Sequence, residues 1–403
     1  MKALLLENIH PDAARLLEGE GIEVETRKGA LDENELIEAL EGVDLLGIRS
    51  KTMVTRRVLE ARPDLISVGA FSIGTNQIDL DAAAETSTVV FNAPYSNTRS
   101  VVELALGEII NLARHIGDHN RKMHDGLWDK TAKGSHEVRG RTLGIVGYGN
   151  IGSQLSVLAE SVGMRVYFYD IVDRLALGNA VRCSTLEELL ETVETVSVHV
   201  DGRAENKNMF DRETFAMMRP RTLFLNLSRG HLVDLEALRD ALLSGHIAGA
   251  GVDVFPVEPK KAGDPFESVL QGIPNVILTP HIGGSTAEAQ EDIGRFVAGK
   301  FRDYVKTGST YMSVNLPEVQ LDKLKSGARL LHLHRNEPGV LAHVNSVLGE
   351  YGVNIDSQHL ATRDGYGYVV TDCGNGVPQE AIDAIRALPA TTRLSVVGEL
   401  RGA

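Results

Sequence analysis

The sequence predicts an α/β protein with two doubly wound parallel sheets, followed by a C-terminal ferredoxin-like βαββαβ domain. Short apolar runs alternate with stretches whose apolar residues recur at helical spacing, and this alternation restarts after a long helical stretch near residue 100. Strands that alternate with helices usually form a parallel sheet that is covered on both faces. After residue 325 the order changes to βαββαβ, which is typical of a ferredoxin-like arrangement.

Length, charge and cysteine content narrow the class of protein. A chain of 403 residues is too long for one ordinary core, so we expect two or three domains. The formal net charge of −14 argues against nucleic acid and anionic membranes as partners. The N-terminal apolar run is too short for a signal peptide, and no segment has the roughly 18 apolar residues of a membrane span. Cys183 and Cys373 match no metal-binding or redox motif, so we expect a cytoplasmic protein without a bound metal.

The first hundred residues predict the sheet of a first domain. The expected strands are the apolar runs at 2–6, 44–48, 65–71 and 88–93, and helical patterns lie between them. Asp32 and Glu35 have the spacing of a capping box at the start of one of these helices. Two long helical stretches, 100–122 and 286–306, are expected to cross between domains. Residues 1–96 and 284–320 would then form the first domain together.

The restarted alternation predicts a second domain over residues 97–283. We expect its sheet to contain strands at 142–147, 165–170, 195–200, 222–228, 248–255 and 276–280. A linker precedes the third domain, which we place at 326–403. The strands expected there are 329–335, 353–362, 366–373 and 392–400, and two helical patterns lie between them.

A glycine-rich loop follows the first strand of the second domain. The stretch GIVGYGNIGSQL contains Gly147, Gly149 and Gly152 in the G-x-G-x-x-G pattern, and Asp170 ends the next strand about 20 residues further on. The first glycine permits a tight turn, the second lets a pyrophosphate approach the backbone, and the third allows close packing of helix on strand. We therefore expect NAD to bind at these residues: Gly147, Tyr148, Gly149, Asn150, Ile151, Gly152 and Asp170.

Three further polar stretches end or follow strands of the same sheet. They contain Arg229, Glu258 and His281, and ligands of open α/β sheets bind outside the carboxyl ends of the strands. Alone, each residue is more often a surface or turn residue. Together they suit hydride transfer at a 2-hydroxy acid, because Arg229 can hold a carboxylate and His281 can exchange the hydroxyl proton. Glu258 would orient the imidazole and favour its protonated form.

The order GYGNIG, SRG, VDVFPVEP, TPHIGGST resembles that of the D-isomer-specific 2-hydroxyacid dehydrogenases. The resemblance covers nearly the whole chain and implies the roles given above to Arg229, Glu258 and His281. It also implies that Asp253, in GVDVF, lies near the nicotinamide end of the cofactor site; a strand-end cap is the alternative for this residue.

Two other stretches, FSIGTNQIDLDAAA and FNAPYSNTRSVVELALGEI, narrow the resemblance. With the C-terminal domain, they are similar to family members that oxidise 3-phospho-D-glycerate to 3-phosphohydroxypyruvate in the first step of L-serine synthesis. A substrate with a phosphate and a carboxylate needs cations beyond Arg229. The substrate-binding residues expected from sequence and resemblance are Lys28, Arg49, Ser50, Lys51, Ser72, Ile73, Gly74, Asn97 and Lys130. Lys28 and Lys130 are equally compatible with solvated surface lysines.

The C-terminal domain resembles an ACT domain, a small regulatory module, and carries no plausible catalytic pair. In related enzymes two such domains pair and bind L-serine at their interface, and the matching positions here are His334, Asn336 and Asn354. The resemblance therefore implies feedback inhibition by L-serine in a homo-oligomer, either a dimer or a tetramer. The alternative is a C-terminal domain that serves assembly only. The resemblance also implies that Trp128 packs into a neighbouring subunit; a tryptophan in the core is the alternative for this residue.

Two other functions remain open from the sequence. One is a D-2-hydroxyacid dehydrogenase for another acid, such as hydroxypyruvate, glycerate or 2-oxoglutarate. The other is a non-catalytic scaffold that senses NAD, since proteins of that kind share the fold.

Overall fold

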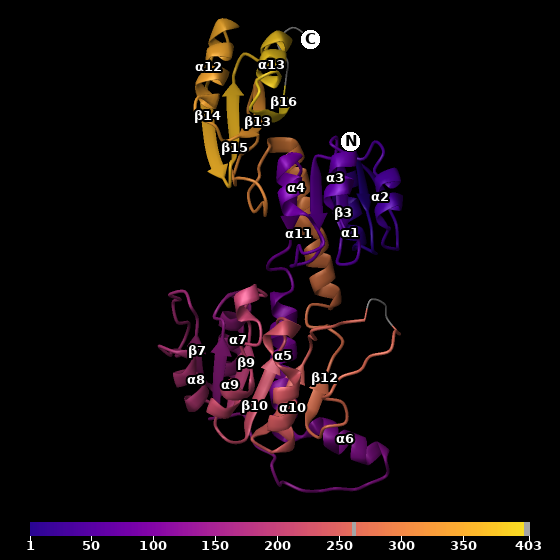
Figure 1. The fold of residues 1–403 in the computed structure, drawn as a ribbon, viewed down its shortest axis with the longest axis vertical. Helices are drawn as coiled ribbons and strands as arrows, with labels where there is room; N and C mark the ends of the chain where they lie inside the picture. The colour runs from indigo at the N-terminus through magenta and orange to yellow at the C-terminus, as the bar shows by residue number, and fades with distance from the viewer. Residues whose placement is uncertain (260–262, 399–403) are drawn as a thin grey trace. The chain divides into compact units, whose positions relative to one another are not determined.

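A computed structural model describes residues 1–259 and 263–398 (Figure 1). The chain divides into two compact units, and each is described by itself. The first unit comprises Met1–Ser96 with Gln290–Ala403, and the second comprises Asn97–Ala289. The last residues of the strand predicted at 392–400 lie outside the described residues.

The first unit contains a parallel sheet with strand order β2-β1-β3-β4-β5. Its strands are β1 (Lys2–Leu5), β2 (Glu23–Thr26), β3 (Leu45–Ile48), β4 (Ser67–Ala70) and β5 (Val89–Asn92). Its helices are α1 (Pro11–Glu18), α2 (Glu33–Ala39), α3 (Arg56–Ala61), α4 (Leu80–Glu85) and most of α11 (Ala287–Thr307). Helix α11 packs closely on the sheet, because a Cβ on Gly69 would lie only 2.5 Å from Val297 Cγ1. The predicted doubly wound architecture is confirmed.

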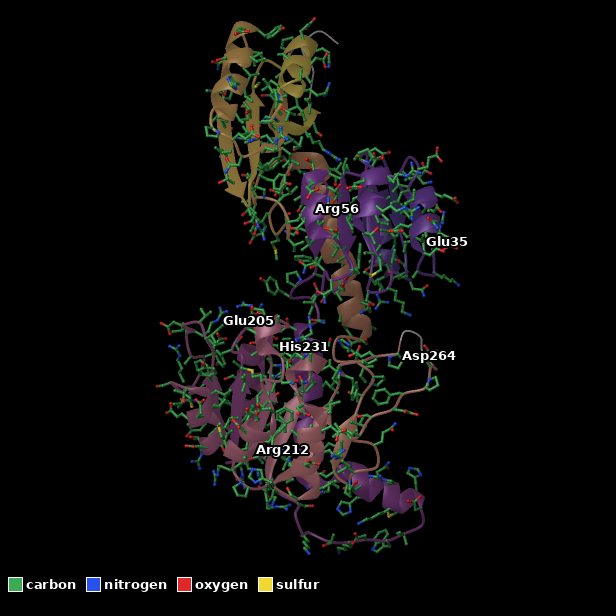
Figure 2. The ribbon with its side chains drawn as sticks, in the orientation of Figure 1. Glu35, Arg56, Glu205, Arg212, His231 and Asp264 are labelled. Atoms are coloured by element: carbon green, nitrogen blue, oxygen red, sulfur yellow. The ribbon has the colours of Figure 1, made fainter. Side chains whose placement is uncertain are left out.

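Two local predictions for this sheet had different outcomes. The capping box at the start of α2, the helix that carries Glu35 in Figure 2, is confirmed: Glu35 N donates to Asp32 Oδ1 at 2.9 Å, and Asp32 N donates to Glu35 Oε2 at 3.0 Å. Strand β2 was not predicted. It lies at the edge of the sheet, and none of its side chains is fully buried, so it lacks the continuous apolar run of the central strands.

The second unit contains a larger parallel sheet with strand order β12-β11-β10-β9-β6-β7-β8. Its strands are β6 (Thr142–Val146), β7 (Arg165–Tyr169), β8 (Val181–Arg182), β9 (Thr195–Val198), β10 (Thr222–Asn226), β11 (Ile247–Val252) and β12 (Val276–Leu278). The covering helices are α5 (Thr98–Arg114), α7 (Asn150–Ser161), α8 (Leu186–Thr192), α9 (Arg212–Met217) and α10 (Leu235–Leu243), with short 3-10 turns η1 (Ala204–Asn206) and η2 (Gly230–Leu232). The exposed, two-residue strand β8 was also missed, for the same reason as β2.

The prediction of a single helix over 100–122 is wrong. His115 has a φ of 53°, in the left-handed region, and it ends α5 and precedes α6 (Ile116–His124). Helix α5 buries one apolar face, whereas no residue of α6 is buried, and the residues after it remain exposed up to Lys133. Trp128, in this segment, is 80% exposed in the single chain.

The C-terminal domain has an antiparallel sheet with strand order β14-β15-β13-β16. Its strands are β13 (Ala328–Arg335), β14 (Ser357–Arg363), β15 (Tyr366–Cys373) and β16 (Thr391–Gly398), and its helices are α12 (Val340–Glu350) and α13 (Gln379–Arg386). Apolar residues of both helices share a core with β13 and β16 on one face of this sheet. The order βαββαβ and the strand order together confirm the predicted ferredoxin-like arrangement.

A buried ion pair ties the start of this sheet to the preceding chain. Arg329, whose side chain is 5% exposed, donates from Nε and Nη2 to the two carboxylate oxygens of Asp372 at 2.6 and 2.8 Å. Its Nη1 donates to the carbonyl oxygens of Thr307 and Asp322 at 2.9 and 2.8 Å. The hydrogen bonds from Arg329 to the Asp372 carboxylate hold the pKa of Asp372 below its usual value.

We expect Arg329→Met to lower the free energy of unfolding by about 3 kcal/mol, because it leaves the mostly buried Asp372 carboxylate without its partner. Differential scanning calorimetry of the full chain measures this loss. Arg386→Met is the control, since Arg386 pairs with Asp383 on the surface of the same domain, and it should change stability by no more than about 0.5 kcal/mol. Equal effects of the two substitutions would show that the Arg329 pair does not stabilise the domain.

Candidate active site

The glycine-rich loop between β6 and α7 has the backbone geometry that its glycines require. Gly147 has a φ of 93°, and a Cβ there would lie 2.6 Å from the carbonyl oxygen of His199. A Cβ on Gly152 would lie 2.2 Å from the carbonyl oxygen of Gly147, so helix and strand pack too closely for any side chain. A Cβ on Gly149, at the helix start, would meet nothing within 4 Å. The amino end of α7 is therefore open to an anionic group.

Asp170 follows β7 and is connected to this loop. Its Oδ2 accepts a hydrogen bond from Tyr148 N, and its Oδ1 accepts one from Val172 N, both at 2.8 Å. Arg174 Nε lies 3.7 Å from Asp170 Oδ2. The Tyr148 side chain faces the core, where it stacks on Phe168, while Asn150 is exposed and Ile151 is half-buried. Tyr148 therefore contacts Asp170 through its backbone N–H and not through its ring.

His281 and Glu258 form a hydrogen-bonded pair at the carboxyl edge of the same sheet. His281 Nδ1 lies 2.8 Å from Glu258 Oε2, and Glu258 Oε1 accepts from Phe255 N at 3.1 Å. The hydrogen bond to Glu258 raises the pKa of His281, although burial opposes this. Burial works against ionisation of Glu258, but the hydrogen bonds from His281 and Phe255 outweigh it and lower its pKa. The pair therefore favours an imidazolium beside a carboxylate.

Asp253 builds the turn that carries His281. Its carboxylate, which is 1% exposed, accepts from Thr279 Oγ1 at 2.6 Å and from the backbone N–H groups of Ile282 and Gly283 at 2.8 Å. The backbone N–H of His281 donates to the carbonyl oxygen of Asp253, also at 2.8 Å. These bonds support a left-handed backbone at His281, whose φ is 54°. Such a conformation is strained for a histidine and persists where its surroundings impose it.

Arg229 follows β10 and lies near the pair, because its charge affects the pKa of both His281 and Glu258. Arg229 Nη1 donates to the carbonyl oxygen of Ser228 at 2.8 Å. The next residue, Gly230, packs against the loop that leads to Glu258: a Cβ there would lie 2.0 Å from the carbonyl carbon of Phe255. Glycine at this position thus lets the two loops approach.

The residues expected to bind substrate are divided between the two units. Asn97 and Lys130 belong to the second unit. A Cβ on Gly284 would lie 2.2 Å from Asn97 Nδ2, so Asn97 contacts the end of the His281 turn, whereas Lys130 is exposed in the segment after α6. In the first unit, Lys28 is exposed after β2, Arg49 is half-buried after β3, and the remaining expected residues are Ser50, Lys51, Ser72, Ile73 and Gly74.

Glu7, at the end of β1, organises the loop after β3 and was not predicted from the sequence. Its buried carboxylate accepts four backbone N–H groups at 2.8 to 3.3 Å, from Arg49, Ser50, Lys51 and Thr52. The carboxylate therefore fixes the backbone of the loop that carries Arg49 and Lys51. Ser72 Oγ donates to the carbonyl oxygen of Gly74 at 2.8 Å in the neighbouring loop after β4. Glu7 has a left-handed backbone, with a φ of 61°, but the stretch LENIH around it matches no motif that would indicate this role from the sequence.

Glu108 is a second acidic residue that sequence reasoning missed. It lies on α5, is 4% exposed, and neither of its carboxyl oxygens has a hydrogen-bond partner among the described residues. Gly251 lies on β11, two residues before Asp253, and a Cβ on it would lie 2.2 Å from Glu108 Oε2. Burial, together with the nearby charge of Asp253, raises the pKa of Glu108 to about 8. At neutral pH this carboxyl is therefore mostly protonated.

The positions expected to bind L-serine differ in exposure. Asn336 and Asn354 are exposed, and Asn336 N donates to the carbonyl oxygen of Gly365 at 2.8 Å. His334 is 3% exposed; its Nδ1 lies 2.7 Å from the carbonyl oxygen of Arg335, and its Nε2 has no partner in the described part of the chain. Its ring lies over Gly367, where a Cβ would come within 2.2 Å of it.

Comparisons with known proteins identify the family and two of the domains. Residues 106–283 match the NAD-binding domain of the D-isomer-specific 2-hydroxyacid dehydrogenases, and residues 330–393 match an ACT domain like that of the AHAS small subunit. The D-3-phosphoglycerate dehydrogenase of Escherichia coli K12 is 50% identical over 98% of this chain and 96% of its own. The enzyme of that name from Haemophilus influenzae is 48% identical over 98% of this chain and 97% of its own.

The chain belongs to the D-isomer-specific 2-hydroxyacid dehydrogenase family.

Solved structures extend the likeness to members of this family with other names. D-2-hydroxyisocaproate dehydrogenase has a TM-score of 0.71 and 25% identity, covering 78% of this chain and 100% of its own. A D-lactate dehydrogenase from Aquifex aeolicus, in complex with NAD and lactic acid, has a TM-score of 0.65 and 25% identity, covering 75% and 95%. The chain is an NAD-dependent oxidoreductase with a C-terminal ACT domain.

No helix among the described residues combines the length and the apolar character needed to cross a bilayer. No group of three or more potential metal-ligating side chains occurs among them either.

The raised pKa of Glu108 predicts a specific dependence of stability on pH. Because the pKa rises from 4.5 to about 8 on folding, the folded state holds an extra proton between these values and loses stability as the pH rises through this window. Glu108→Gln keeps a neutral side chain of similar shape and removes this loss. We therefore expect the melting temperature of Glu108→Gln, relative to wild type, to increase steadily from about pH 5 to about pH 9.

Thermal melts across this range, followed by circular dichroism, test the expectation. Glu103→Gln is the control, because Glu103 is exposed on the same helix and pairs with Arg99. If the difference in melting temperature between Glu108→Gln and wild type did not change with pH, Glu108 would not titrate in this window in the folded state.

Proposed function

We propose that this chain oxidises 3-phospho-D-glycerate to 3-phosphohydroxypyruvate with NAD, the first step of L-serine synthesis. The observation that carries the proposal is the His281–Glu258 pair at 2.8 Å, held at the carboxyl edge of an NAD-binding sheet. The choice of substrate is supported by relatives named D-3-phosphoglycerate dehydrogenase that match 98% of the chain at about half identity. Relatives with other substrates in their names match less of the chain, at lower identity.

In this proposal His281 accepts the hydroxyl proton of the substrate, and the carbon that carries this hydroxyl loses a hydride. A bound NAD, held by the glycine-rich loop and Asp170, would supply the hydride acceptor. Glu258 stabilises the imidazolium that forms, since the hydrogen bond between them raises the pKa of His281. Arg229 binds the carboxylate of the substrate and polarises the reacting C–O bond. Asp253 keeps His281 in place through its turn, and Asp170 hydrogen-bonds the ribose hydroxyls of the adenosine.

The phosphate requires further cations, and the loop after β3 supplies them. We assign the phosphate to Arg49 and Lys51, whose backbone N–H groups are already taken by Glu7. Ser50 belongs to the same loop. The backbone N–H groups of Ser72, Ile73 and Gly74 are assigned as further donors to the carboxylate. Asn97, Lys28 and Lys130 are assigned to the substrate as well.

The ACT domain is assigned to regulation by L-serine. Asn336 and Asn354 are exposed polar residues whose amide groups suit a zwitterion, because amide oxygens accept from an ammonium group and amide N–H groups donate to a carboxylate. We propose that two ACT domains of a homo-oligomer pair at this surface, with His334 beside the bound amino acid. Two buried free cysteines are compatible with the reducing cytoplasm as its location.

The proton-transfer roles predict the first result. His281→Ala should lower kcat by roughly 10²- to 10⁴-fold, the usual worth of general acid–base catalysis. Glu258→Gln should lower kcat by a smaller factor. In its pH profile of kcat/KM for oxidation, the acid limb should move to lower pH, because His281 loses the partner that raises its pKa. Steady-state rates from NADH absorbance measure both, and Glu267→Gln, an exposed change between β11 and β12, is the control. Near-normal turnover of His281→Ala would overturn the assignment.

The substrate assignment predicts a selective effect of Arg49. Arg49→Ala should raise KM for 3-phospho-D-glycerate by about 10- to 100-fold, the worth of a hydrogen bond to a charged group, and should affect an unphosphorylated 2-hydroxy acid much less. Arg57→Ala serves as the control, since Arg57 pairs with Glu33 on the surface. Rates of the wild-type enzyme with a panel of unphosphorylated acids, namely glycerate, lactate and 2-hydroxyglutarate, show whether 3-phospho-D-glycerate is the preferred substrate. If Arg49→Ala raised KM equally for all of them, Arg49 would not bind the phosphate.

The regulatory assignment predicts that millimolar L-serine inhibits the wild-type enzyme. Asn354→Ala and Asn336→Ala should abolish the inhibition and leave kcat nearly unchanged, because a coupling of about 1–3 kcal/mol is lost without any change at the reacting atoms. Asn345→Ala, a change on α12 that removes an exposed contact with Gln358, should retain the inhibition. Calorimetry that detected no serine binding to the wild-type chain would favour a domain that serves assembly only.

A further inference from the structure

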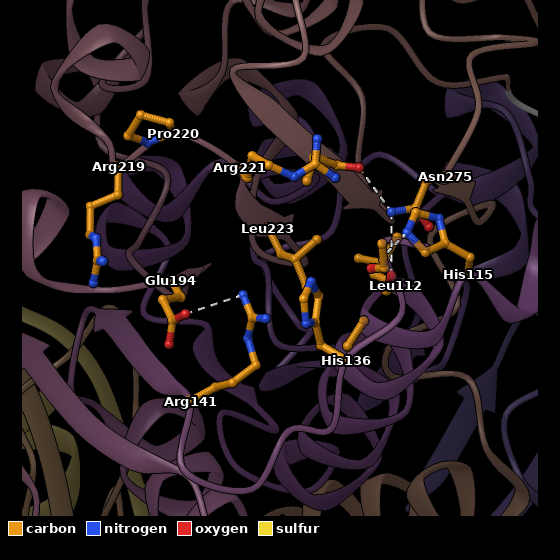
Figure 3. A pocket seen from close by; sticks show the side chains of 13 residues that line it. Leu112, His115, His136, Arg141, Glu194, Arg219, Pro220, Arg221, Leu223 and Asn275 are labelled. Carbon is orange, nitrogen blue, oxygen red and sulfur yellow. Dashed lines mark hydrogen bonds and ion pairs between the residues drawn. The ribbon is translucent and has the colours of Figure 1, made fainter. Parts of the chain in front are cut away.

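A cavity of about 190 Å³ lies at the amino ends of the strands in the second sheet, away from the loop expected to bind NAD (Figure 3). Four of the residues that line it come directly before a strand: Arg141 before β6, Glu194 before β9, Arg221 before β10 and Asn275 before β12. The glycine-rich loop follows the carboxyl end of β6. Because the strands are parallel, the cavity and the glycine-rich loop lie at opposite edges of the sheet.

We propose that this cavity is a second anion site, which binds a phosphate group either as the free ion or as a monoester. Its charge is the first support. Of the described residues that line it, Arg141, Arg219 and Arg221 are cations and Glu194 is the carboxylate. Asp118 lies near the wall, but its carboxylate accepts from Arg121 Nη2 at 2.6 Å and from Asn275 N at 2.9 Å. In a chain of net charge −14, this excess of arginines is local.

The hydrogen bonds of Arg141 are incomplete, which is the second support. Arg141 Nη2 and Glu194 Oε1 are 3.5 Å apart, and Arg141 Nε is buried without any partner among the described residues. The other oxygen of Glu194 accepts from Thr142 N at 3.1 Å. Arg219 Nη1 donates to the carbonyl oxygen of Thr192 at 3.2 Å. Buried N–H groups are almost always satisfied in folded proteins, so an acceptor in the cavity would complete the hydrogen bonds of Arg141, while Arg219 lies at the exposed rim.

Arg221 supplies the third support. Its φ is 69°, a left-handed conformation that a glycine adopts without strain and an arginine does not. The strain is held by a hydrogen bond of 2.6 Å from Arg221 N to the carbonyl oxygen of His246. Arg221 is exposed, and in the described part of the chain its guanidinium makes no hydrogen bond or ion pair, so it is available to a ligand. The structure thus keeps a charged side chain at a strained position on the cavity wall, and strained residues of this kind gather at ligand sites.

The chemistry of the wall selects the ligand. Guanidinium groups are planar forks that bind phosphate through paired hydrogen bonds, and a phosphate dianion would balance the excess positive charge. The opposite wall is rigid, because Asn275 Nδ2 donates to the carbonyl oxygens of Leu112 and Ala248 at 3.3 and 2.9 Å. A tetrahedral oxyanion with a small substituent fits a cavity of this size.

Isothermal titration calorimetry of the full chain with inorganic phosphate tests the proposal, at an ionic strength kept constant with sodium chloride. Arg221→Gly and Arg141→Gln should each weaken phosphate binding at least tenfold. Arg221→Gly should also melt no lower than wild type, since it relieves the left-handed strain, and neither variant should change kcat. Arg212→Gln, an exposed change on α9, should bind phosphate as wild type does.

Arg49→Ala separates this site from the phosphate site proposed for the substrate, and it should keep the binding that Arg221→Gly loses. A parallel titration with glycerol 2-phosphate identifies the source of the ligand: tighter binding than inorganic phosphate points to a monoester, and weaker binding to the free ion. The proposal is overturned if both cavity variants bind both ligands as wild type does, or if Arg49→Ala alone removes all phosphate binding.

Discussion

The parallel arrangement of the strands is the constraint on which both units depend. When all strands of a sheet run in the same direction, their carboxyl ends share one edge, and loops from distant parts of the sequence meet there. In the second unit this brings the segments after β10, β11 and β12 together, so that Arg229, Glu258 and His281 lie near one another. In the first unit the same constraint puts Glu7, after β1, beneath the loop after β3.

The same constraint explains how much could be predicted from the sequence. Central strands such as β4 and β10 are buried on both faces and read as continuous apolar runs, and the fold class followed from their alternation with helices. The glycine positions were also predictable, because Gly147 and Gly152 occupy places where a Cβ would collide with backbone. Motif order was enough to propose His281 and Glu258, since their roles depend on residue type and on strand ends.

What could not be predicted depends on contacts between segments that have no motif. The edge strand β2 has no buried face that would give it a pattern, and the end of α5 depends on a left-handed His115 that the helical spacing does not indicate. Glu7 and Glu108 resemble ordinary surface glutamates in the sequence, and only the fold shows that each is buried. Burial of a carboxyl is a tertiary property, so composition and periodicity carry no information about it.

The buried carboxyl groups show how one fold can hold the same chemical group in different states. Asp253 accepts three hydrogen bonds that shape the turn of His281, whereas Glu108 has no hydrogen-bond donor among the described residues, and burial raises the pKa of Glu108 to about 8. Glu258 is hydrogen-bonded to the imidazole, which lowers its pKa even though burial opposes ionisation. The presence of hydrogen-bond donors at Glu258 and their absence at Glu108 therefore shift the pKa values of these two carboxyls in opposite directions. Among the groups that act on His281, Glu258 raises its pKa most, through the hydrogen bond and its charge; the charge of Asp253 raises it further, and that of Arg229 lowers it.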